Sequence, residues 1–458
     1  MTKTSGVDLD LVEGDGALAK RLNRILNSPD MRRSRSFNKL LQGFHLKVTT
    51  TSEVDGRRVV IDGRPVVNFG SANYLGLEQH PEVLEAARAA LSVWGNHSGC
   101  SRIFTSHENI LDLETDLAAL VGAESAIVYP NTSSAHIGTI PTLFSRPKTT
   151  LFLDRYAHMS MHHAAWIAVA KGARIVRVDI RDLEETEKRV QEDPGTLKAI
   201  LVDGVYSMQG TVPDLSSLQA LSDRCGAILY IDDAHGIAIL GETGGGVVES
   251  FGLSYDNLVL VGGLQKGLGA YGGFVAGSRV LTDILRVSSR TYTFSGTLQP
   301  QAVEGSRAAI RVCRSDEGKA LRAKLEAMSA RVRAGLSEMG FVVESGTSPI
   351  VSVLIGPDFR TLMAGRRLFD SGVYVNSVLY PATPKGEGLL RISLNAIHSD
   401  DEVRLLMKSF AELKIYLDRF HDPRQQFGYA REFAARQMGR SIRGGQAKVA
   451  GWLKTAGL

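Results

Sequence analysis

Two short stretches decide the fold of this 458-residue chain. Residues 229–236 read Leu-Tyr-Ile-Asp-Asp-Ala-His-Gly, and residues 259–267 read Val-Leu-Val-Gly-Gly-Leu-Gln-Lys-Gly. The first apolar run ends in acids and a histidine, and the second ends in a single lysine among glycines. Short apolar runs of this kind are typical of parallel strands buried on both faces. The pattern predicts an α/β fold whose strands deliver polar groups at their carboxyl ends, where open α/β sheets bind ligands.

A carboxylate and a lone lysine at neighbouring strand ends match the needs of pyridoxal phosphate. The lysine can form a Schiff base with that cofactor, and the carboxylate can pair with its pyridinium nitrogen. Glycines around Lys266 would let the backbone approach a ligand closely, and a buried lysine has a lowered pKa that suits this chemistry. Each stretch alone also has a purely structural interpretation. The acids of the first could cap a helix, and the lysine of the second could simply be solvated.

The remaining pattern predicts a large domain, a smaller domain and two extensions. Residues 66–300 alternate between expected strands and helices, which indicates a parallel sheet covered by helices. The expected helices there span residues 82–90 and 109–120, and the expected strands span residues 126–129, 175–178 and 199–202. Residues 301–415 form a smaller C-terminal α/β unit with a charged helix at 316–338 and a strand at 350–355. Residues 1–65 are an N-terminal arm, and residues 416–458 are a basic extension with interleaved aromatic side chains.

Composition excludes several classes of protein. The chain is 43% hydrophobic and 22% charged, which is ordinary for a globular protein, and its formal charge of +4 is too small to indicate nucleic-acid binding. No apolar run reaches the ~18 residues of a membrane span, and the polar start lacks a signal-peptide core. The 3 cysteines are scattered and lack metal-ligand spacing. Such cysteine usage is typical of a reducing compartment, so a cytoplasmic location is expected.

Several further motifs, in order along the chain, resemble the α-oxoamine synthases, a family of fold-type I pyridoxal-phosphate enzymes. That family includes serine palmitoyltransferase and aminooxononanoate synthase, and residues 241–253 are most similar to the former. The resemblance implies a two-domain transferase fold, with a large domain built on a mainly parallel sheet and a smaller α/β domain. Besides the two stretches above, the matching motifs are Asn-Phe-Gly-Ser-Ala-Asn-Tyr-Leu-Gly-Leu at 68–77, Asp-Arg-Tyr-Ala-His at 154–158, Asp-Gly-Val-Tyr-Ser-Met at 203–208, Tyr-Val-Asn at 374–376, Tyr-Pro-Ala-Thr-Pro at 380–384, Leu-Arg-Ile-Ser at 390–393 and Ala-Ile-His at 396–398.

The resemblance also implies the cofactor-binding and catalytic residues. Pyridoxal 5′-phosphate would bond to Lys266, Asp232 would keep its ring nitrogen protonated, and His235 would lie against its phenolic oxygen. His158 would stack on the ring, and Ser207 would hydrogen-bond near it. The neighbouring His162 and His163 raise the alternative of a metal site, but the motif singles out His158 and no metal is expected.

The phosphate site departs from the family pattern. Members bind phosphate through a Ser-Gly-aromatic turn before a helix, whereas residues 130–136 here read Pro-Asn-Thr-Ser-Ser-Ala-His. Backbone amides of Thr132 and Ser133 would serve instead, and Gly263 replaces a common threonine. The segment 291–300 resembles one that reaches the partner subunit's phosphate, so Ser295 and Thr297 are expected to act in trans in a homodimer with a shared active site.

The implied reaction is a decarboxylative Claisen-type condensation of a small amino acid with an acyl thioester. Arg391 would bind the amino-acid carboxylate, because a guanidinium holds a carboxylate through two parallel hydrogen bonds, and Asn73 is expected beside the substrate. Serine or alanine is favoured and glycine is possible, while acyl-CoA and an acyl carrier protein (ACP) both remain open as thioester donors. Ala72 and Cys100 depart from the family near the substrate.

Three alternatives remain open at this stage. The chain could be another fold-type I enzyme, such as an aldolase or an aminotransferase, or an aminooxononanoate synthase-like or aminoketobutyrate ligase-like enzyme. It could also be an inactive partner subunit, although such subunits typically lack the lysine that is present here. The basic extension could contact a carrier protein or lie peripherally on the inner membrane surface, or it could pack on a neighbouring subunit.

Overall fold

A seven-stranded, mainly parallel sheet forms the centre of the chain in the computed structural model, which describes residues 16–32, 34, 51–97, 99 and 101–419. Its strand order is β4-β10-β9-β8-β7-β5-β6, and only β10 runs antiparallel to its neighbours. This architecture confirms the fold predicted from the sequence. The strands are β4 (Ser125–Tyr129), β5 (Thr149–Asp154), β6 (Arg174–Val178), β7 (Leu197–Asp203), β8 (Ala227–Asp232), β9 (Leu258–Gly263) and β10 (Gly273–Gly277).

The two apolar stretches form the adjacent central strands β8 and β9, and their side chains point alternately to two separate hydrophobic clusters. Leu229 and Ile231 belong to one cluster, whereas Tyr230 belongs to the other. A strand whose two faces are both buried needs an unbroken apolar run, because alternate side chains point to opposite faces. The covering helices are α4 (Glu108–Val121), α5 (Thr132–Phe144), α6 (Met159–Val169), α7 (Leu183–Glu192), α8 (Leu215–Arg224), α9 (Val247–Phe251), α10 (Arg279–Ser288) and α11 (Arg290–Thr293).

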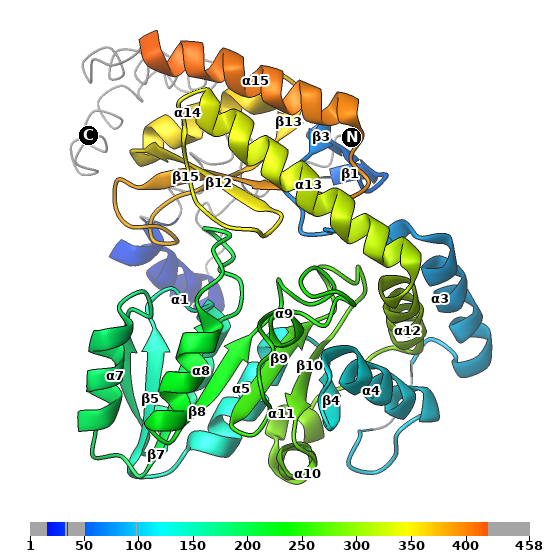
Figure 1. Cartoon of the computed structure of the whole chain (residues 1–458), viewed down its shortest axis with the longest axis vertical. Coiled ribbons are helices and arrows are strands. Elements are labelled where there is room, and N and C mark those ends of the chain that lie inside the picture. The colour runs from blue at the N-terminus through cyan, green and yellow to red at the C-terminus, as the bar shows by residue number, and fades with distance from the viewer. Residues whose placement is uncertain (1–15, 33, 35–50, 98, 100, 420–458) are drawn as a thin grey trace.

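A smaller unit lies on top of this large domain in Figure 1 and contains an antiparallel four-stranded sheet in the order β11-β12-β15-β14. The expected helix at 316–338 and strand at 350–355 are present as α13 and β12. The unit's elements are β11 (Val342–Val343), β12 (Ile350–Gly356), β14 (Asn376–Val378), β15 (Gly388–Ser393), α13 (Asp316–Glu338), α14 (Asp358–Asp370) and α15 (Asp400–Arg419).

The structure differs from the expected domain boundaries at three places. Strands β1 (Thr51–Val54), β2 (Arg58–Ile61) and β3 (Arg64–Asn68) form a sheet with β13 (Val373–Tyr374), so the end of the expected arm belongs with the smaller unit. The 3-10 helix η1 (Leu77–Gln79) and helix α3 (Pro81–Trp94) follow, and α12 (Pro300–Arg314) packs against α3 and α4 in the large domain. Helix α15 continues through Arg419, past residue 415.

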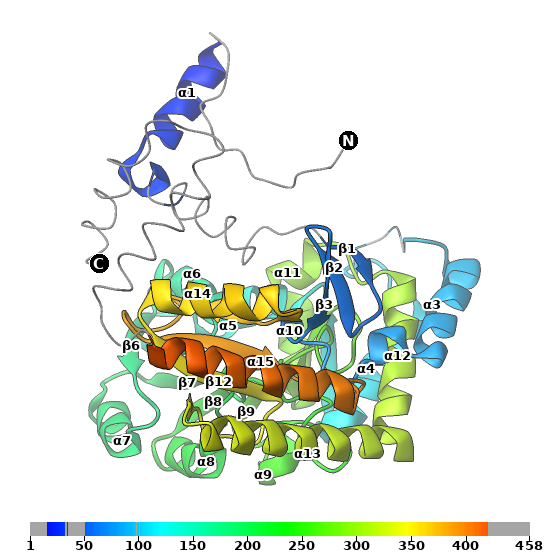
Figure 2. The same ribbon diagram turned by 90° about the horizontal axis from the view of Figure 1, so that it is seen from above.

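Helix α1 (Ala17–Leu26) lies apart from the two domains in Figure 2. None of its residues is buried, and Leu18, Leu22 and Ile25 are exposed. Cys100 and the extension beyond Arg419 lie outside the described residues. Within the described residues, no helix combines the length and apolar character needed to cross a membrane.

Candidate active site

The ends of β7, β8 and β9 meet the start of α5 and α6 around a cavity of about 170 Å³. Strand register places Asp203 level with Asp232, and Asp232 level with Val261, just before the Lys266 turn. The sites expected from the sequence at Lys266, Asp232, His158, His235, Thr132 and Ser133 therefore converge here. The lining residues are Asn131, Thr132, Ser133, His158, Asp203, Val205, Asp232, Ala234, His235, Gln265 and Lys266.

Lys266 lies in the turn between β9 and β10, and the turn's glycines let it pack against the body of the domain. Gly269 donates its N–H to the Lys266 carbonyl at 3.2 Å and has a left-handed φ of 60°. A Cβ atom at Gly267 would collide with the carbonyl oxygen of Ile237. Burial lowers the pKa of Lys266 to about 8, although the carboxylates of Asp232 and Asp203 oppose that shift. At physiological pH a larger fraction of this amine is thus in the neutral, nucleophilic form than for an ordinary lysine.

The lowered pKa of Lys266 predicts the pH dependence of cofactor capture. An ammonium group has no lone pair to attack an aldehyde, so the capture rate should rise with pH through about 8 and level off above it. For a lysine with the ordinary pKa of about 10.4, the midpoint of this rise would lie about two pH units higher. Stopped-flow absorbance of cofactor-free protein mixed with pyridoxal phosphate measures this rate, and a midpoint near 10 would contradict the environment described for Lys266.

Asp232 is a buried carboxylate whose two oxygens have different partners. Its Oδ1 accepts the backbone N–H of Ala234 at 3.0 Å, and its Oδ2 lies 2.8 Å from Nε2 of His136. Burial alone would raise the pKa of Asp232, but His136 and Lys266 hold it well below its usual range. Asp203 behaves oppositely, because burial and the nearby Asp232 raise its pKa well above normal. Asp232 is therefore the carboxyl group of this pair that stays negatively charged.

The neighbouring Asp233 points away from the cavity. Its Oδ2 accepts the backbone N–H of Val247 at 2.8 Å, at the start of α9, and burial raises its pKa well above the ordinary value. Adjacent residues of a strand end face opposite sides, so the Asp-Asp pair combines one site residue with one structural residue. Both the functional and the capping interpretation of that pair thus apply, each to one of the two acids.

His158 is the N-cap residue of α6, and its ring lines the cavity. Its Nδ1 lies 2.6 Å from Oγ of Ser160, and its backbone N–H donates to Asp203 at 3.0 Å. Burial lowers the pKa of His158, so the ring is mainly neutral. His162 and His163 instead pack around Trp166. In the described part of the chain, no group of at least three His, Cys, Asp or Glu side chains could hold a metal ion.

A buried tyrosine that the sequence analysis did not assign connects His235 to Arg391. The hydroxyl of Tyr74 lies 2.7 Å from Nδ1 of His235 and accepts a hydrogen bond from Arg391 at 3.3 Å. Nε of Arg391 is buried and has no hydrogen-bond partner in the described part of the chain. Burial lowers the pKa of His235 well below normal, and Lys266 and Arg391 lower it further. The signal was present, because Tyr74 belongs to the motif at 68–77.

Other residues expected at the site do not line this cavity within one copy of the chain. Asn73 was expected beside the substrate, but it does not line the Lys266 cavity. It lies near Glu78: burial raises the pKa of Glu78, and the hydrogen bond with Asn73 partly offsets that rise. Ser207 is half-buried and also lies outside the lining, as does Ser295, whose hydroxyl donates to the carbonyl of Thr291. Local motifs do not reveal which side of a turn a side chain occupies.

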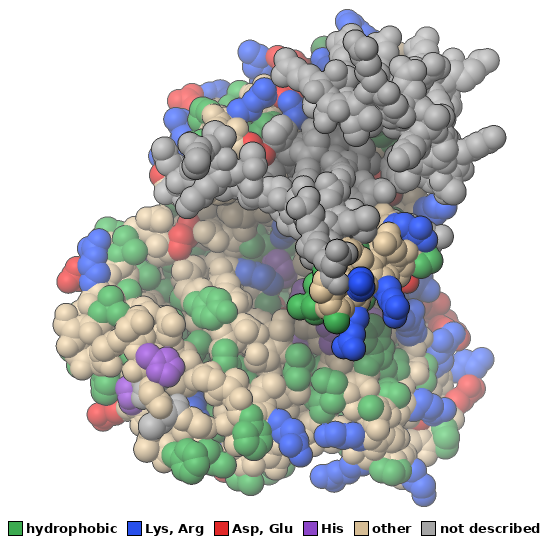
Figure 3. All heavy atoms as spheres, turned by 180° about the vertical axis from the view of Figure 1, so that it is seen from behind, with side chains coloured by type: hydrophobic (Ala, Val, Ile, Leu, Met, Phe, Trp, Pro, Cys, Tyr) green, Lys and Arg blue, Asp and Glu red, His purple; other side chains and the backbone are tan. Residues whose placement is uncertain are grey.

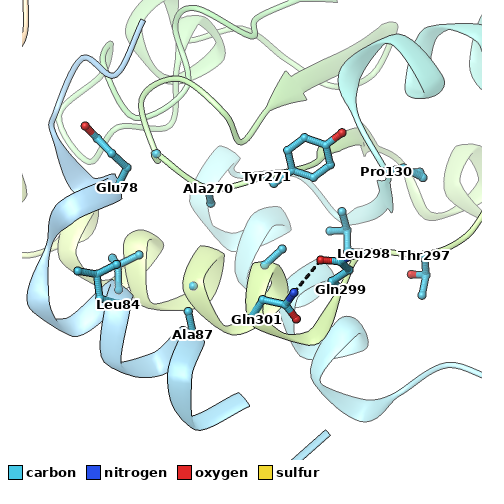
Figure 4. A pocket seen from close by; sticks show the side chains of 14 residues that line it. Glu78, Leu84, Ala87, Pro130, Ala270, Tyr271, Thr297, Leu298, Gln299 and Gln301 are labelled. Atoms are coloured by element: carbon cyan, nitrogen blue, oxygen red, sulfur yellow. Dashed lines mark hydrogen bonds between the residues drawn. The ribbon is translucent and has the colours of Figure 1, made fainter. Parts of the chain in front are cut away.

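Thr297 lines a second cavity of about 720 Å³ between α3, α12 and the end of the Lys266 turn. Figure 4 shows Thr297 and Pro130 on one side of this pocket and Leu84 and Ala87 on the other. Pro130 directly precedes Asn131 and Thr132, which line the Lys266 cavity, so consecutive residues of one turn line both cavities.

The start of α5 fits a phosphate group. Helix geometry leaves the first backbone N–H groups, those of Thr132 and Ser133, without acceptors inside the helix. The Thr132 hydroxyl is buried and has no partner among the described residues. A Cβ atom at Gly263 would lie 2.9 Å from that hydroxyl. The Thr132 hydroxyl thus lies close to where a side chain at position 263 would begin. It can offer the phosphate the hydroxyl that Gly263 lacks.

The fold and this site together define a fold-type I pyridoxal-phosphate transferase. Residues 64–410 match the family "Aminotransferase class I and II", and the chain belongs to that family. It is 35% identical over 374 residues to 8-amino-7-oxononanoate synthase of Geobacter sulfurreducens, covering 81% of this chain and 95% of that protein. It is 34% identical over 355 residues to serine palmitoyltransferase of Caulobacter vibrioides, covering 77% and 87% respectively.

A solved structure agrees with these sequence matches. Serine palmitoyltransferase of Sphingomonas wittichii superposes with a TM-score of 0.81 at 30% identity, covering 86% of this chain and 99% of that one. Both kinds of relative are α-oxoamine synthases, which confirms the family expected from the motifs. The cofactor expected from the sequence, pyridoxal phosphate, is the cofactor of these relatives.

Proposed function

We propose that this chain condenses a small L-amino acid with an acyl thioester, with loss of CO₂ and free thiol, to give an α-amino ketone. The observation that carries the proposal is the cavity in which Lys266, Asp232, His158 and His235 converge, linked through Tyr74 to the buried guanidinium of Arg391. Similarity over most of the chain to aminooxononanoate synthase and serine palmitoyltransferase supports the same reaction class.

The main groups of the cavity have distinct tasks in this reaction. Bound pyridoxal phosphate supplies an electron sink for the carbanion formed at the amino acid's Cα. Lys266 would hold the cofactor, and its Nζ is the base that can take the Cα proton and later return it. Asp232 would hold a negative charge against the ring nitrogen, and the α5 N-terminus would bind the phosphate. The neutral His158 ring would cover the cofactor and offer a hydrogen bond to the acyl group.

A substrate screen with one long-chain acyl-CoA tests the proposed reaction. Serine, alanine and glycine are supplied in turn, and free thiol and CO₂ are measured separately. The expected result is release of both in equal amounts with serine or alanine. Transamination releases neither product, and an aldolase releases no thiol, so either outcome would overturn the proposal. Repeating the screen with acyl-ACP identifies the carrier.

Arg391 should determine amino-acid affinity. Arg391→Ala removes a charged hydrogen-bond donor, so the amino-acid dissociation constant should rise roughly 10- to 150-fold, equivalent to about 1.5–3 kcal/mol. Arg391→Lys should restore only part of this affinity, because an ammonium cannot form two parallel hydrogen bonds. The spectral change on titration with amino acid gives both constants. Unchanged affinity in both variants would remove Arg391 from the substrate site.

The exposed surface of the large domain supports the homodimer that the sequence predicts. Figure 3 shows hydrophobic side chains spread over this face of the lower, large-domain half. On α10 the exposed Val280, Ile284 and Val287 recur at helical spacing and therefore share one face, as at an interaction site. A second copy could bring Ser295 and Thr297 to the phosphate of its partner. The exposed residues include Ile103, Phe104, Met159, Trp166, Ile167, Val169, Tyr271, Val280, Ile284, Val287 and Phe294.

The extension beyond Arg419 is the proposed contact for an acyl carrier protein or an anionic membrane surface of a cytosolic enzyme. Its arginines would bind either partner by charge, and such contacts weaken as the Debye length falls from about 10 Å at 0.1 M salt to about 3 Å at 1 M. A chain ending at Arg419 should remain a yellow dimer and lose activity towards long acyl substrates only at low salt. A colourless monomer would instead assign the extension a structural role.

A further inference from the structure

A fully buried histidine lies directly behind Asp232 and takes no part in the reaction described above. His136, on α5, is 0% exposed, and its Nε2 lies 2.8 Å from Oδ2 of Asp232. Its Nδ1 lies 2.9 Å from the hydroxyl of Tyr230. Tyr230 and Asp232 are alternate residues of β8, so their side chains share one face of the strand, and the imidazole bridges them.

The hydrogen atoms of this chain of groups can be assigned. Asp232 is an anion that only accepts, so Nε2 of His136 must carry a proton. Burial raises the pKa of Tyr230 well above its ordinary value, and Asp232 raises it further, so Tyr230 remains a phenol. The phenol can donate to Nδ1 of a neutral imidazole. Each hydrogen-bonding group in the series Tyr230–His136–Asp232 then has a partner. This arrangement selects the tautomer of His136 that carries its proton on Nε2.

Other ionisable groups also lie near Asp232, on the segments packed around it. Lys266 in the β9–β10 turn and His158 at the N-cap of α6 lower the pKa of Asp232. Asp203 at the end of β7 and Asp233, one residue past β8, are acidic neighbours. The amine of Lys266 is the group proposed to bond the cofactor and move protons, so its charge changes during turnover. His136 is a constant hydrogen-bond donor on the side of Asp232 occupied by α5.

We propose that His136 is a positioning residue for Asp232, which fixes the orientation and negative charge of the carboxylate that pairs with the cofactor's ring nitrogen, and that Tyr230 fixes the donor tautomer of His136. This inference rests on the proposed cofactor site. His136 occupies the last position of the stretch 130–136, which the family resemblance assigns to the phosphate, and Tyr230 lies within the apolar run that predicts the strand.

The test measures the ring nitrogen directly. Wild type, His136→Leu, His136→Gln, Tyr230→Phe and the double variant His136→Gln/Tyr230→Phe are loaded with pyridoxal phosphate labelled with ¹⁵N in the ring. The ¹⁵N chemical shift over a pH range reports protonation of that atom, and equilibrium titration gives cofactor affinity. Steady-state kinetics separates kcat from the KM for the amino acid. Circular dichroism and thermal unfolding establish that each variant is folded.

His136→Leu should lose ring protonation at a pH where wild type retains it, with kcat lower by about 10- to 100-fold. That range is the one found when the outer hydrogen-bond partner of a metal ligand is removed. The KM for the amino acid should change little, because Arg391 is untouched. His136→Gln should keep the protonated ring, since its amide still donates to Asp232. Tyr230→Phe should lower ring protonation and kcat when His136 is present. In the His136→Gln background it should have no added effect, because glutamine has no tautomer to fix.

A folded His136→Leu with the wild-type ¹⁵N shift and kcat would overturn the proposal and leave His136 a purely structural core residue. If His136→Leu does not fold, the two Tyr230→Phe variants decide, because an equal effect in both backgrounds contradicts tautomer selection. Failure of the wild-type protein to bind the labelled cofactor at all would refute the proposed function itself, and that outcome is distinguishable from the others.

Discussion

Lys266→Ala is expected to abolish turnover, with a loss beyond the roughly 10²–10⁴-fold contributed by a general acid–base group alone. The reason is that Lys266 combines two tasks, since it would hold the cofactor covalently and also move the Cα proton. Its lowered pKa of about 8 and its place in the cavity with Asp232 suit both tasks. Thiol release in the condensation assay measures the loss.

Lys266→Arg is the matched control for this prediction. Arginine keeps a positive charge opposite Asp232 but provides no amine that can bond to an aldehyde, so it should be as inactive as alanine. Borohydride treatment of the wild type should leave the cofactor on the peptide that contains Lys266, and mass spectrometry would locate it. Wild-type turnover in either variant would contradict the central assignment of the active site.

The sequence predicted the parts of the fold and site that depend on local pattern. The apolar runs before Asp232 and Lys266 are strands because a sheet covered on both faces requires such runs, and the carboxyl ends of adjacent strands necessarily meet. The pairing of β3 with β13 was not predictable in this way, because it joins Val67 to Val373 across most of the chain. A local pattern carries no information about such a distant partner.

The same distinction explains the site residues that were missed. Tyr74 and His136 act through contacts with Arg391 and Asp232 that are distant in sequence, at 3.3 Å and 2.8 Å. Each lies inside a motif that had been given another task. Asn73, the neighbour of Tyr74, was expected at the substrate, but it lies near Glu78. Neighbouring residues of a loop point in different directions, and only tertiary packing decides which one contacts His235 and Arg391.

Asp232→Asn is expected to bind cofactor yet lose most carbanion formation, again by more than the roughly 10²–10⁴-fold typical of a general acid–base group. A neutral amide cannot hold a proton on the pyridine nitrogen, so the ring would no longer withdraw electrons strongly. The structure favours a large effect, because Asp232 stays anionic in spite of its burial. Exchange of the amino acid's Cα proton with deuterated solvent, followed by NMR, measures this step without the thioester.

Asp233→Asn is the matched control, since the same isosteric change is made one residue further along. Asp233 points to α9, burial raises its pKa well above the ordinary value, and an amide oxygen can still accept the N–H of Val247. Its variant should therefore keep near-normal proton exchange. If Asp232→Asn exchanged normally while Asp233→Asn did not, the roles of the two acids would be reversed. Equal losses in both would indicate a general structural effect, and the contrast between the two variants thus isolates the charge at Asp232.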